Sequence, residues 1–130
     1  MIKLYRKTRD GMDYFETWKD KGVQTVHWGK VGERGQSKEF KETLLRAAAK
    51  EVKAQIALKK QEGYRAIPQE DHSFLLIEYS IEGMGSKEDL EKRHRLEARM
   101  NDLLGWSGLG HCDGGSIGSG IFLRTHNAAR

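Results

Sequence analysis

Short alternations of apolar and polar residues fill the first forty positions and predict a sheet of antiparallel strands. Patterns with a period of two place one set of side chains on a buried face and the other on an exposed face. Turn-forming residues interrupt the alternation at Asp10-Gly11, at residues 20–22 and at residues 32–35. The sequence therefore predicts a four-stranded meander, with strands near residues 2–5, 14–18, 23–31 and 36–40.

After residue 41 the spacing of apolar residues lengthens to three or four, which predicts an amphipathic helix over residues 42–61. Its apolar stripe consists of Leu45, Ala48 or Ala49, Val52 and Ile56. Lys59 and Lys60 suit the negative end of the helix dipole, and Gly63 can close the helix in the left-handed conformation. A short return strand is expected at residues 64–67, before Pro68.

The second half of the chain predicts a strand, a helix, a long loop and a last strand. Residues 75–81 carry apolar side chains on both faces, as central strands do. Ser86 is a suitable N-cap for a helix over residues 87–104, and residues 105–120 are rich in glycine and are expected to form a loop. The expected buried stripe of the helix is Leu90, Leu96, Met100 and Leu103, and the last strand covers residues 121–123.

These elements predict an α+β protein with two parts. Residues 1–68 form an antiparallel β-meander with one long amphipathic helix, and residues 69–130 form a small β-α-β extension that contains the glycine-rich loop. The boundary is placed at Pro68, where a polar stretch interrupts the apolar patterns.

Composition narrows the possible surroundings of the protein. No apolar run approaches the roughly 18 to 20 residues that cross a bilayer, and the first residues lack the apolar centre of a signal peptide. The single cysteine, Cys112, fits a reducing compartment, so we expect a cytoplasmic protein. The five histidines and this cysteine do not pair at the spacing of a zinc site, and no metal is expected.

Charge is divided unequally between the two parts. Residues 1–70 hold 16 Lys and Arg against 10 Asp and Glu, whereas the remaining residues hold 7 against 9. The first part therefore has a net charge of +6 and the second of −2. A polyanion such as nucleic acid would be attracted to the first part, although charge alone favours this only weakly.

Residues 27–36 carry the most specific motif and read His-Trp-Gly-Lys-Val-Gly-Glu-Arg-Gly-Gln. This segment resembles the signature Trp-Gly-Arg-x-Gly-x-x-Gly-Gln of the WGR domain family. The family places its signature late in a meander and follows it with an amphipathic helix that ends in lysines and a Gly-Tyr pair, here Gly63 and Tyr64. The resemblance covers residues 1–68, and extensions like the second part accompany some bacterial members.

The resemblance implies a function in binding DNA. In poly(ADP-ribose) polymerases, WGR domains sit at DNA breaks, where the tryptophan packs on a terminal nucleotide and basic residues meet backbone phosphates. Carried over to this chain, Trp28 would stack, Gly29 would allow a close approach, and Lys30 and Arg34 would meet phosphates. The resemblance implies this set of nucleic-acid-binding residues: Trp28, Gly29, Lys30, Arg34, Gln36 and Tyr64.

Two features leave the assignment open. Lys30 stands where the family has arginine, and lysine lacks the planar fork that binds two oxygens at once. Trp28 lies in a predicted strand, so its ring could belong to the core, and Gly32 and Gly35 could serve only to form the hairpin turn.

His111, Cys112 and Asp113 raise the alternative of a thiol nucleophile activated by histidine. Adjacent residues of an extended chain point to opposite sides, so His111 and Cys112 do not readily hydrogen-bond through their side chains. The glycine-rich segment also follows a helix and precedes a strand, the reverse of the order in phosphate-binding loops. We therefore expect neither enzymatic activity nor a cofactor.

The sequence thus favours a non-catalytic module that contacts DNA ends or backbone phosphates. The alternative is a protein-interaction or regulatory module with negligible affinity for nucleic acid, in which Trp28 and the surface of the helix meet a partner protein.

Overall fold

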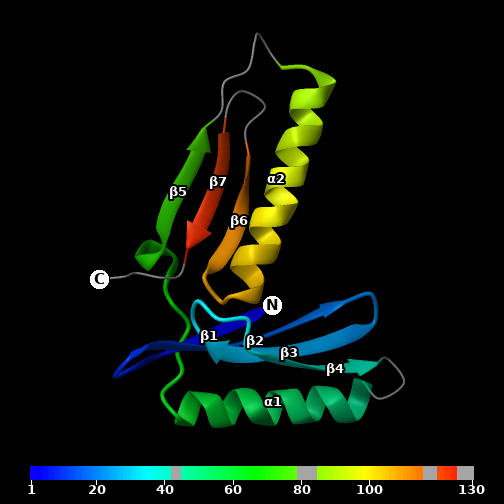
Figure 1. The fold of residues 1–130 in the computed structure, drawn as a ribbon. Helices are drawn as coiled ribbons and strands as arrows, with labels where there is room; N and C mark the ends of the chain where they lie inside the picture. The colour runs from blue at the N-terminus through cyan, green and yellow to red at the C-terminus, as the bar shows by residue number, and fades with distance from the viewer. Residues whose placement is uncertain (42–44, 79–84, 116–119, 126–130) are drawn as a thin grey trace. The chain divides into compact units, whose positions relative to one another are not determined.

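The computed structural model contains two compact units, Met1–Ile67 and Pro68–Arg130. Unit 1 denotes the first and unit 2 the second. The structure describes residues 1–41, 45–78, 85–115 and 120–125 (Figure 1). Among these residues, no helix is both long and apolar enough to cross a membrane.

Unit 1 begins with four antiparallel strands whose order in the sheet equals their order in the chain. They are β1 (Ile2–Thr8), β2 (Gly11–Asp20), β3 (Val23–Lys30) and β4 (Gln36–Lys41). Lys21 and Gly22, between β2 and β3, have positive φ angles of 47° and 77°. Such two-residue turns match the twist of a hairpin. The predicted meander is confirmed.

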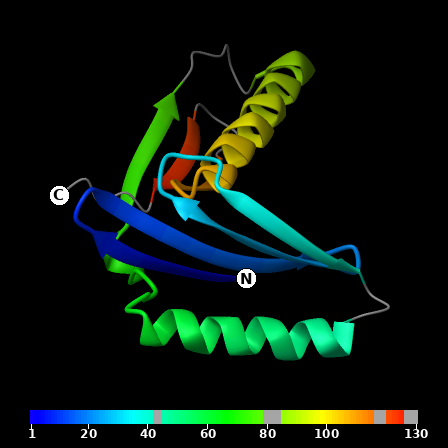
Figure 2. The same ribbon diagram turned by 60° about the horizontal axis from the view of Figure 1, so that its bottom comes forward.

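The helix α1 (Leu45–Gln61) lies along one face of this sheet in both views (Figures 1 and 2). Ala48 and Val52 are buried and Ile56 is partly buried, as the predicted stripe requires. Residues 42–44 and the side chain of Leu45 lie outside the described part. The core between helix and sheet consists of Leu4, Phe15, Val26, Val52 and Tyr64, with Trp28, Phe40 and Ile56 packed against it.

The chain leaves α1 through Gly63, whose φ of 97° is the left-handed conformation expected of a residue that closes a helix. Tyr5 and Arg65 then exchange two backbone hydrogen bonds of 2.8 Å along the outer edge of β1. The prediction of a strand over residues 64–67 is therefore wrong, because only this one pair forms a bridge. Pro68, which has no N–H to offer a ladder, soon follows, and the short helix η2 (Gln69–Asp71) begins unit 2.

Unit 2 contains a second antiparallel sheet of three strands in the order β5-β7-β6. The strands are β5 (Ser73–Glu78), β6 (Gly110–Gly115) and β7 (Gly120–Thr125). Two predictions are wrong here. The strand predicted to be central, β5, lies at the edge, and part of the predicted glycine-rich loop is the strand β6. Tyr79 and Ile81, which belonged to that predicted strand, lie outside the described residues.

The glycine-rich segment forms a strand because β7 supplies a complete ladder for it. β7 pairs with β5 on one side and with β6 on the other, so it satisfies the backbone groups of β6 despite the weak strand propensity of glycine. A shift of register between Cys112 and Gly114 absorbs an irregularity in the ladder, as glycine-rich strands often require. Pairing within the sheet thus overrides local composition.

The helix α2 (Lys87–Trp106) begins at the predicted N-cap. The backbone N–H of Asp89 donates to the Ser86 hydroxyl at 3.1 Å, and the backbone N–H of Ser86 donates to the Asp89 carboxylate at 2.8 Å. These reciprocal bonds form a capping box, and the hydrogen bonds from Ser86 hold the pKa of Asp89 below its ordinary value.

The stripe that α2 buries differs from the predicted one. Leu90 and Leu103 are 44% and 58% exposed, so their predicted burial is wrong. The helix instead turns Leu96, Met100 and Leu104 inward, because residues four apart lie on one side of a helix. Ile77, Leu109 and Cys112 complete this small core.

Candidate nucleic-acid interface

The connection between β3 and β4, residues 31–35, folds back over the face of the sheet opposite α1. Tyr14 and His27 alternate with core residues along β2 and β3, so they point to that face. The Tyr14 hydroxyl donates to the carbonyl oxygens of Glu33 and Arg34, which lie 3.0 and 2.9 Å away. The sheet therefore holds the 31–35 loop by its backbone.

Burial, together with the charges of Glu16 and Glu33, raises the pKa of Tyr14 to about 12. The Tyr14 hydroxyl therefore stays protonated at neutral pH and remains a hydrogen-bond donor to the loop.

His27 is the centre of a buried row of polar groups and is 0% exposed. Its Nδ1 lies 2.6 Å from Glu16 Oε1, and its Nε2 lies 2.5 Å from the carbonyl oxygen of Arg34. Both partners are acceptors, so a protonated ring nitrogen of His27 donates to the partner that it faces. Lys3 Nζ lies 3.4 Å from the other oxygen of Glu16. The Lys3 ammonium and the His27 ring thus accompany this buried carboxylate and offset its desolvation.

Two glycines of the signature are required by the fold of the loop itself. A Cβ atom at Gly29 would lie 2.7 Å from the Cα atom of Gly35, closer than real Cβ atoms approach. Gly35 has a φ of 67°, and a Cβ atom there would overlap the carbonyl oxygen of Trp28 and the hydroxyl of Tyr14. The loop therefore packs directly on β3, and only glycine fits at the contact.

Trp28 lies on the face of the sheet that α1 covers. It stands opposite Phe15 on β2 and opposite Gln36 on β4. The ring packs against the core of unit 1 but is only partly buried, while Gln36 is exposed. Trp28 therefore combines the two alternatives that the sequence left open, since one part of its surface belongs to the core and another reaches solvent.

The two basic residues of the signature are both exposed. Lys30 ends β3 and, within the described part of the chain, its ammonium group forms no ion pair. Arg34 lies in the 31–35 loop, where its carbonyl oxygen is held by Tyr14 and His27. The structure thus anchors the backbone at Arg34, although the residue is exposed.

Tyr64 is 6% exposed and belongs to the core of unit 1. The Arg6 guanidinium lies 4.7 Å and the Lys59 ammonium 5.2 Å from the centre of its ring, both within the range of cation–π contacts. Arg6 is also paired with Asp13 at 3.0 Å, and Lys59 with Glu62 at 3.0 Å. Tyr64 therefore positions cations at the end of α1, and its own ring has little surface for a ligand.

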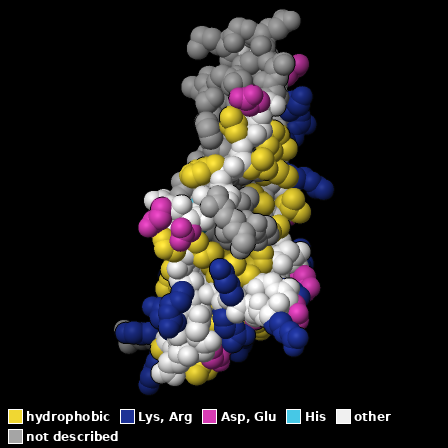
Figure 3. Space-filling view, turned by 90° about the vertical axis from the view of Figure 1, so that its left-hand side faces the viewer, with side chains coloured by type: hydrophobic (Ala, Val, Ile, Leu, Met, Phe, Trp, Pro, Cys, Tyr) yellow, Lys and Arg dark blue, Asp and Glu magenta, His cyan; other side chains and the backbone are white. Residues whose placement is uncertain are grey.

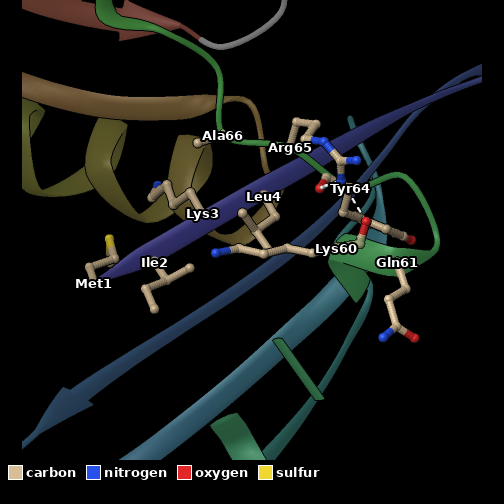
Figure 4. A pocket seen from close by; sticks show the side chains of 9 residues that line it. All are labelled: Met1, Ile2, Lys3, Leu4, Lys60, Gln61, Tyr64, Arg65 and Ala66. Carbon is tan, nitrogen blue, oxygen red and sulfur yellow. Dashed lines mark hydrogen bonds between the residues drawn. The ribbon is translucent and has the colours of Figure 1, made fainter. Parts of the chain in front are cut away.

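An open cavity of about 850 Å³ lies beside Tyr64, between β1 and the end of α1 (Figure 4). Its charged side chains are Lys3, Lys60 and Arg65, and none of the described residues that line it carries a carboxylate. The Arg65 guanidinium donates a hydrogen bond to the carbonyl oxygen of Tyr64 at 2.8 Å, and this bond holds the side chain in place. Lys and Arg side chains are numerous over unit 1 in the space-filling view (Figure 3). This end of unit 1 is therefore suited to anions.

The structure brings some of the predicted site residues together and separates others. Trp28, Lys30 and Gln36 share one face of the sheet, whereas the loop that carries Arg34 packs on the other. The sequence missed Arg6, whose contact with Tyr64 depends on the tertiary fold. Lys59 was expected only to complement the helix dipole. Its position five residues before Tyr64, across the left-handed turn at Gly63, is the signal from which its contact with the Tyr64 ring could have been predicted.

In unit 2, the segment considered for a nucleophile is a strand. Cys112 is half-buried and packs against Leu104, and its backbone N–H donates to the Asn101 side chain at 2.8 Å. His111 and Cys112 alternate along β6, so their side chains point to opposite faces. The side chain of Asp113 lies outside the described part. Among the described residues, no three His, Cys, Asp or Glu side chains lie close enough together to hold a metal ion.

Replacing Cys112 with serine is expected to lower the free energy of unfolding by only about 1 kcal/mol, because a hydroxyl replaces a half-buried thiol of similar size. Urea denaturation of the wild-type and Cys112→Ser proteins measures this difference. Loss of an enzymatic activity in the folded variant would instead support a nucleophilic thiol.

Comparison with known families agrees with this geometry. The profile of the WGR domain matches residues 11–71, which include β2 to β4, the 31–35 loop and α1. Neither the comparison with curated proteins nor the comparison with solved structures found a match. The matched segment covers nearly all of unit 1 and only the first residues of unit 2. Residues 11–71, which lie almost wholly within unit 1, are therefore similar to the WGR domain.

Proposed function

We propose that unit 1 binds DNA at a break or along the backbone, through Trp28, Lys30 and Arg34. The observation that carries the proposal is the anchored 31–35 loop. Two buried side chains and a glycine contact fix its backbone, while the basic residues at its two ends remain exposed. A binding surface that is ordered before the ligand arrives loses less conformational entropy on binding.

Lys30 supplies the clearest phosphate contact. Its ammonium is exposed and forms no ion pair within the described residues, so a phosphate would not have to displace an internal partner. It follows Trp28 by two residues on the same face of β3, so one nucleotide could meet both the ring and the ammonium. The partly exposed ring of Trp28 offers a stacking surface, and Gln36 lies beside it.

The proposed module is non-catalytic and needs no cofactor. Its basic residues attract phosphates, and the groups that it buries, His27, Glu16 and Tyr14, bind one another and the 31–35 loop. They therefore serve to position the loop, and DNA would be held without being chemically changed.

Replacing Lys30 with alanine is expected to weaken DNA binding and to make the slope of log affinity against log salt concentration shallower by about one unit, since one phosphate contact releases one counterion. The measurement is a titration of labelled duplexes, intact or carrying a break with a 5′ phosphate, at several salt concentrations. Lys53→Ala is the matched control, because Lys53 is an exposed lysine of α1 outside the proposed surface. It should leave both affinity and slope unchanged.

Replacing Trp28 with phenylalanine is expected to reduce affinity for the broken duplex without changing the salt slope, because stacking, worth about 1–3 kcal/mol per base, releases no ions. Phenylalanine keeps most of the apolar packing that Trp28 gives the core. Trp106→Phe, in unit 2, is the control and should leave the affinity unchanged. Circular dichroism confirms that each variant is folded.

If the wild-type protein shows no binding near 50 mM salt at roughly 100 μM protein, the DNA function is wrong, because non-specific affinities lie within that range. The protein-interaction alternative would then take its place, with the Trp28 face as the surface to test first.

A further inference from the structure

The strand β5 leaves an unusual amount of apolar surface in solvent. Phe74, Leu75 and Leu76 are consecutive and are 61%, 53% and 45% exposed. Figure 3, which shows the left-hand side of Figure 1, has prominent apolar side chains over unit 2. Among the described residues, Ile77 is the one residue of β5 that packs against the core beneath α2.

β5 also lies at the edge of its sheet. It is the end strand in the order β5-β7-β6, so within the described residues one of its two sides has no neighbouring strand. Proteins usually protect such edges with lysine, proline, a bulge or a very short strand. β5 has the sequence Ser-Phe-Leu-Leu-Ile-Glu, and its pairing with β7 is regular over six residues. The edge is therefore a ready template for another strand.

We infer that β5 pairs with β5 of a second copy of this chain, in antiparallel orientation, so that two three-stranded sheets join into one. A twofold axis makes such an interface from a single self-complementary strand. The inference concerns unit 2 and does not depend on the proposed DNA function.

Symmetry and the pairing rule restrict the register of the two strands. Residues that stand opposite each other in an antiparallel pair either both point their backbone groups at the partner or both point them away. Along one strand this direction alternates, so a residue of β5 must stand opposite a residue of the same parity in the second copy. The centre of the interface is therefore a single residue that stands opposite itself.

Placing Leu75 on the axis gives the best complementarity. Phe74 then stands opposite Leu76 of the second copy, and Leu75 opposite Leu75, so every strongly exposed apolar residue meets another. Placing Leu76 on the axis would instead put Phe74 opposite Glu78. Placing Phe74 there would put Leu75 opposite Ser73.

Charge supports the same arrangement. With Leu75 on the axis, the Glu78 carboxylates of the two copies lie at opposite ends of the interface, far from each other. A parallel pairing in register would place Glu78 beside Glu78, and like charges in neighbouring positions oppose pairing. We therefore commit to the antiparallel dimer centred on Leu75.

Sedimentation velocity of the full chain tests this directly. At about 100 μM, the wild-type protein should sediment at twice the 14.8 kDa mass of one chain. Leu75→Lys places two ammonium groups opposite each other on the axis and should weaken dimerisation by at least about 100-fold. Leu58→Lys is the matched control, because Leu58 lies on α1 and is also 53% exposed. It should remain dimeric.

Disulfide trapping tests the register. In a Cys112→Ser background, Leu75→Cys should form a disulfide-linked dimer on mild oxidation, because residues directly opposite have Cβ atoms about 4.5–5.5 Å apart. Phe74→Cys alone should link poorly, whereas a mixture of Phe74→Cys and Leu76→Cys proteins should link well.

A monomeric wild-type protein would overturn the inference, as would a dimer that Leu75→Lys and Leu58→Lys weaken equally. A monomer in which unit 1 shields the β5 side chains from solvent, shown by slow labelling at Leu75→Cys, would identify unit 1 of the same chain as the occupant and would also overturn it.

Discussion

Replacing Gly35 with alanine is expected to lower the free energy of unfolding by about 3 kcal/mol. A residue with a Cβ atom pays about 1–2 kcal/mol at the left-handed φ of 67°, and overlap in a packed site adds about 1–3 kcal/mol. The overlap is with the Trp28 backbone and the Tyr14 hydroxyl, which hold the 31–35 loop in place. Urea denaturation followed by circular dichroism measures the change.

Gly32 provides the control for this experiment. Its φ of 98° is also positive, but apart from its two chain neighbours no described residue lies within 4 Å of the place where a Cβ atom would stand. Gly32→Ala should therefore show only the conformational part of the effect, about 1–2 kcal/mol. Equal destabilisation by the two substitutions would show that the packing of the loop on β3 contributes little.

Replacing His27 with alanine is expected to destabilise the protein by about 3–5 kcal/mol, because it removes a partner from the buried Glu16 carboxylate and leaves the Arg34 carbonyl with one donor fewer. The loop should also bind DNA more weakly, since the Arg34 carbonyl would lose its contact with His27 and keep the one with Tyr14. Urea denaturation gives the first effect, and the duplex titration gives the second.

The variant Glu16→Gln separates the charge from the packing. The double variant Glu16→Gln/His27→Ala should lose less free energy of unfolding than the sum of the losses in the two single variants, because it has no uncompensated carboxylate. His94→Ala, at an exposed position of α2, is the control and should change stability by less than about 0.5 kcal/mol. Additive effects of Glu16→Gln and His27→Ala would contradict a coupled pair.

The sequence was sufficient for the elements that local patterns define. The meander, the helix α1 and its end at Gly63 follow from period, turn residues and helix-ending signals, and the structure has them at the predicted positions. The signature loop was also located correctly. Gly32 and Gly35 were interpreted as turn formers and Gly29 as allowing a close approach of DNA. The structure adds that Gly29 and Gly35 contact each other, which no local pattern specifies.

The wrong predictions concern segments whose structure depends on pairing or packing between residues that are distant in the sequence. The apolar run around Leu75 indicated a central strand, but β7, from the far end of the chain, takes that place. Likewise, β6 forms from glycine-rich residues because a partner strand is available. The buried row of Glu16 and His27 was invisible for the same reason, since residues eleven positions apart meet only through the register of β2 and β3.

The order of strands in unit 1 also bears on how quickly it folds. Each strand of the meander pairs with its neighbour in the chain, so most contacts of the sheet join nearby residues, and such local topologies cross the folding barrier rapidly. The bridge between Tyr5 and Arg65 is the exception, because it joins opposite ends of the unit. We therefore expect it to form after the folding transition state, so that weakening it should accelerate unfolding while leaving the rate of folding nearly unchanged.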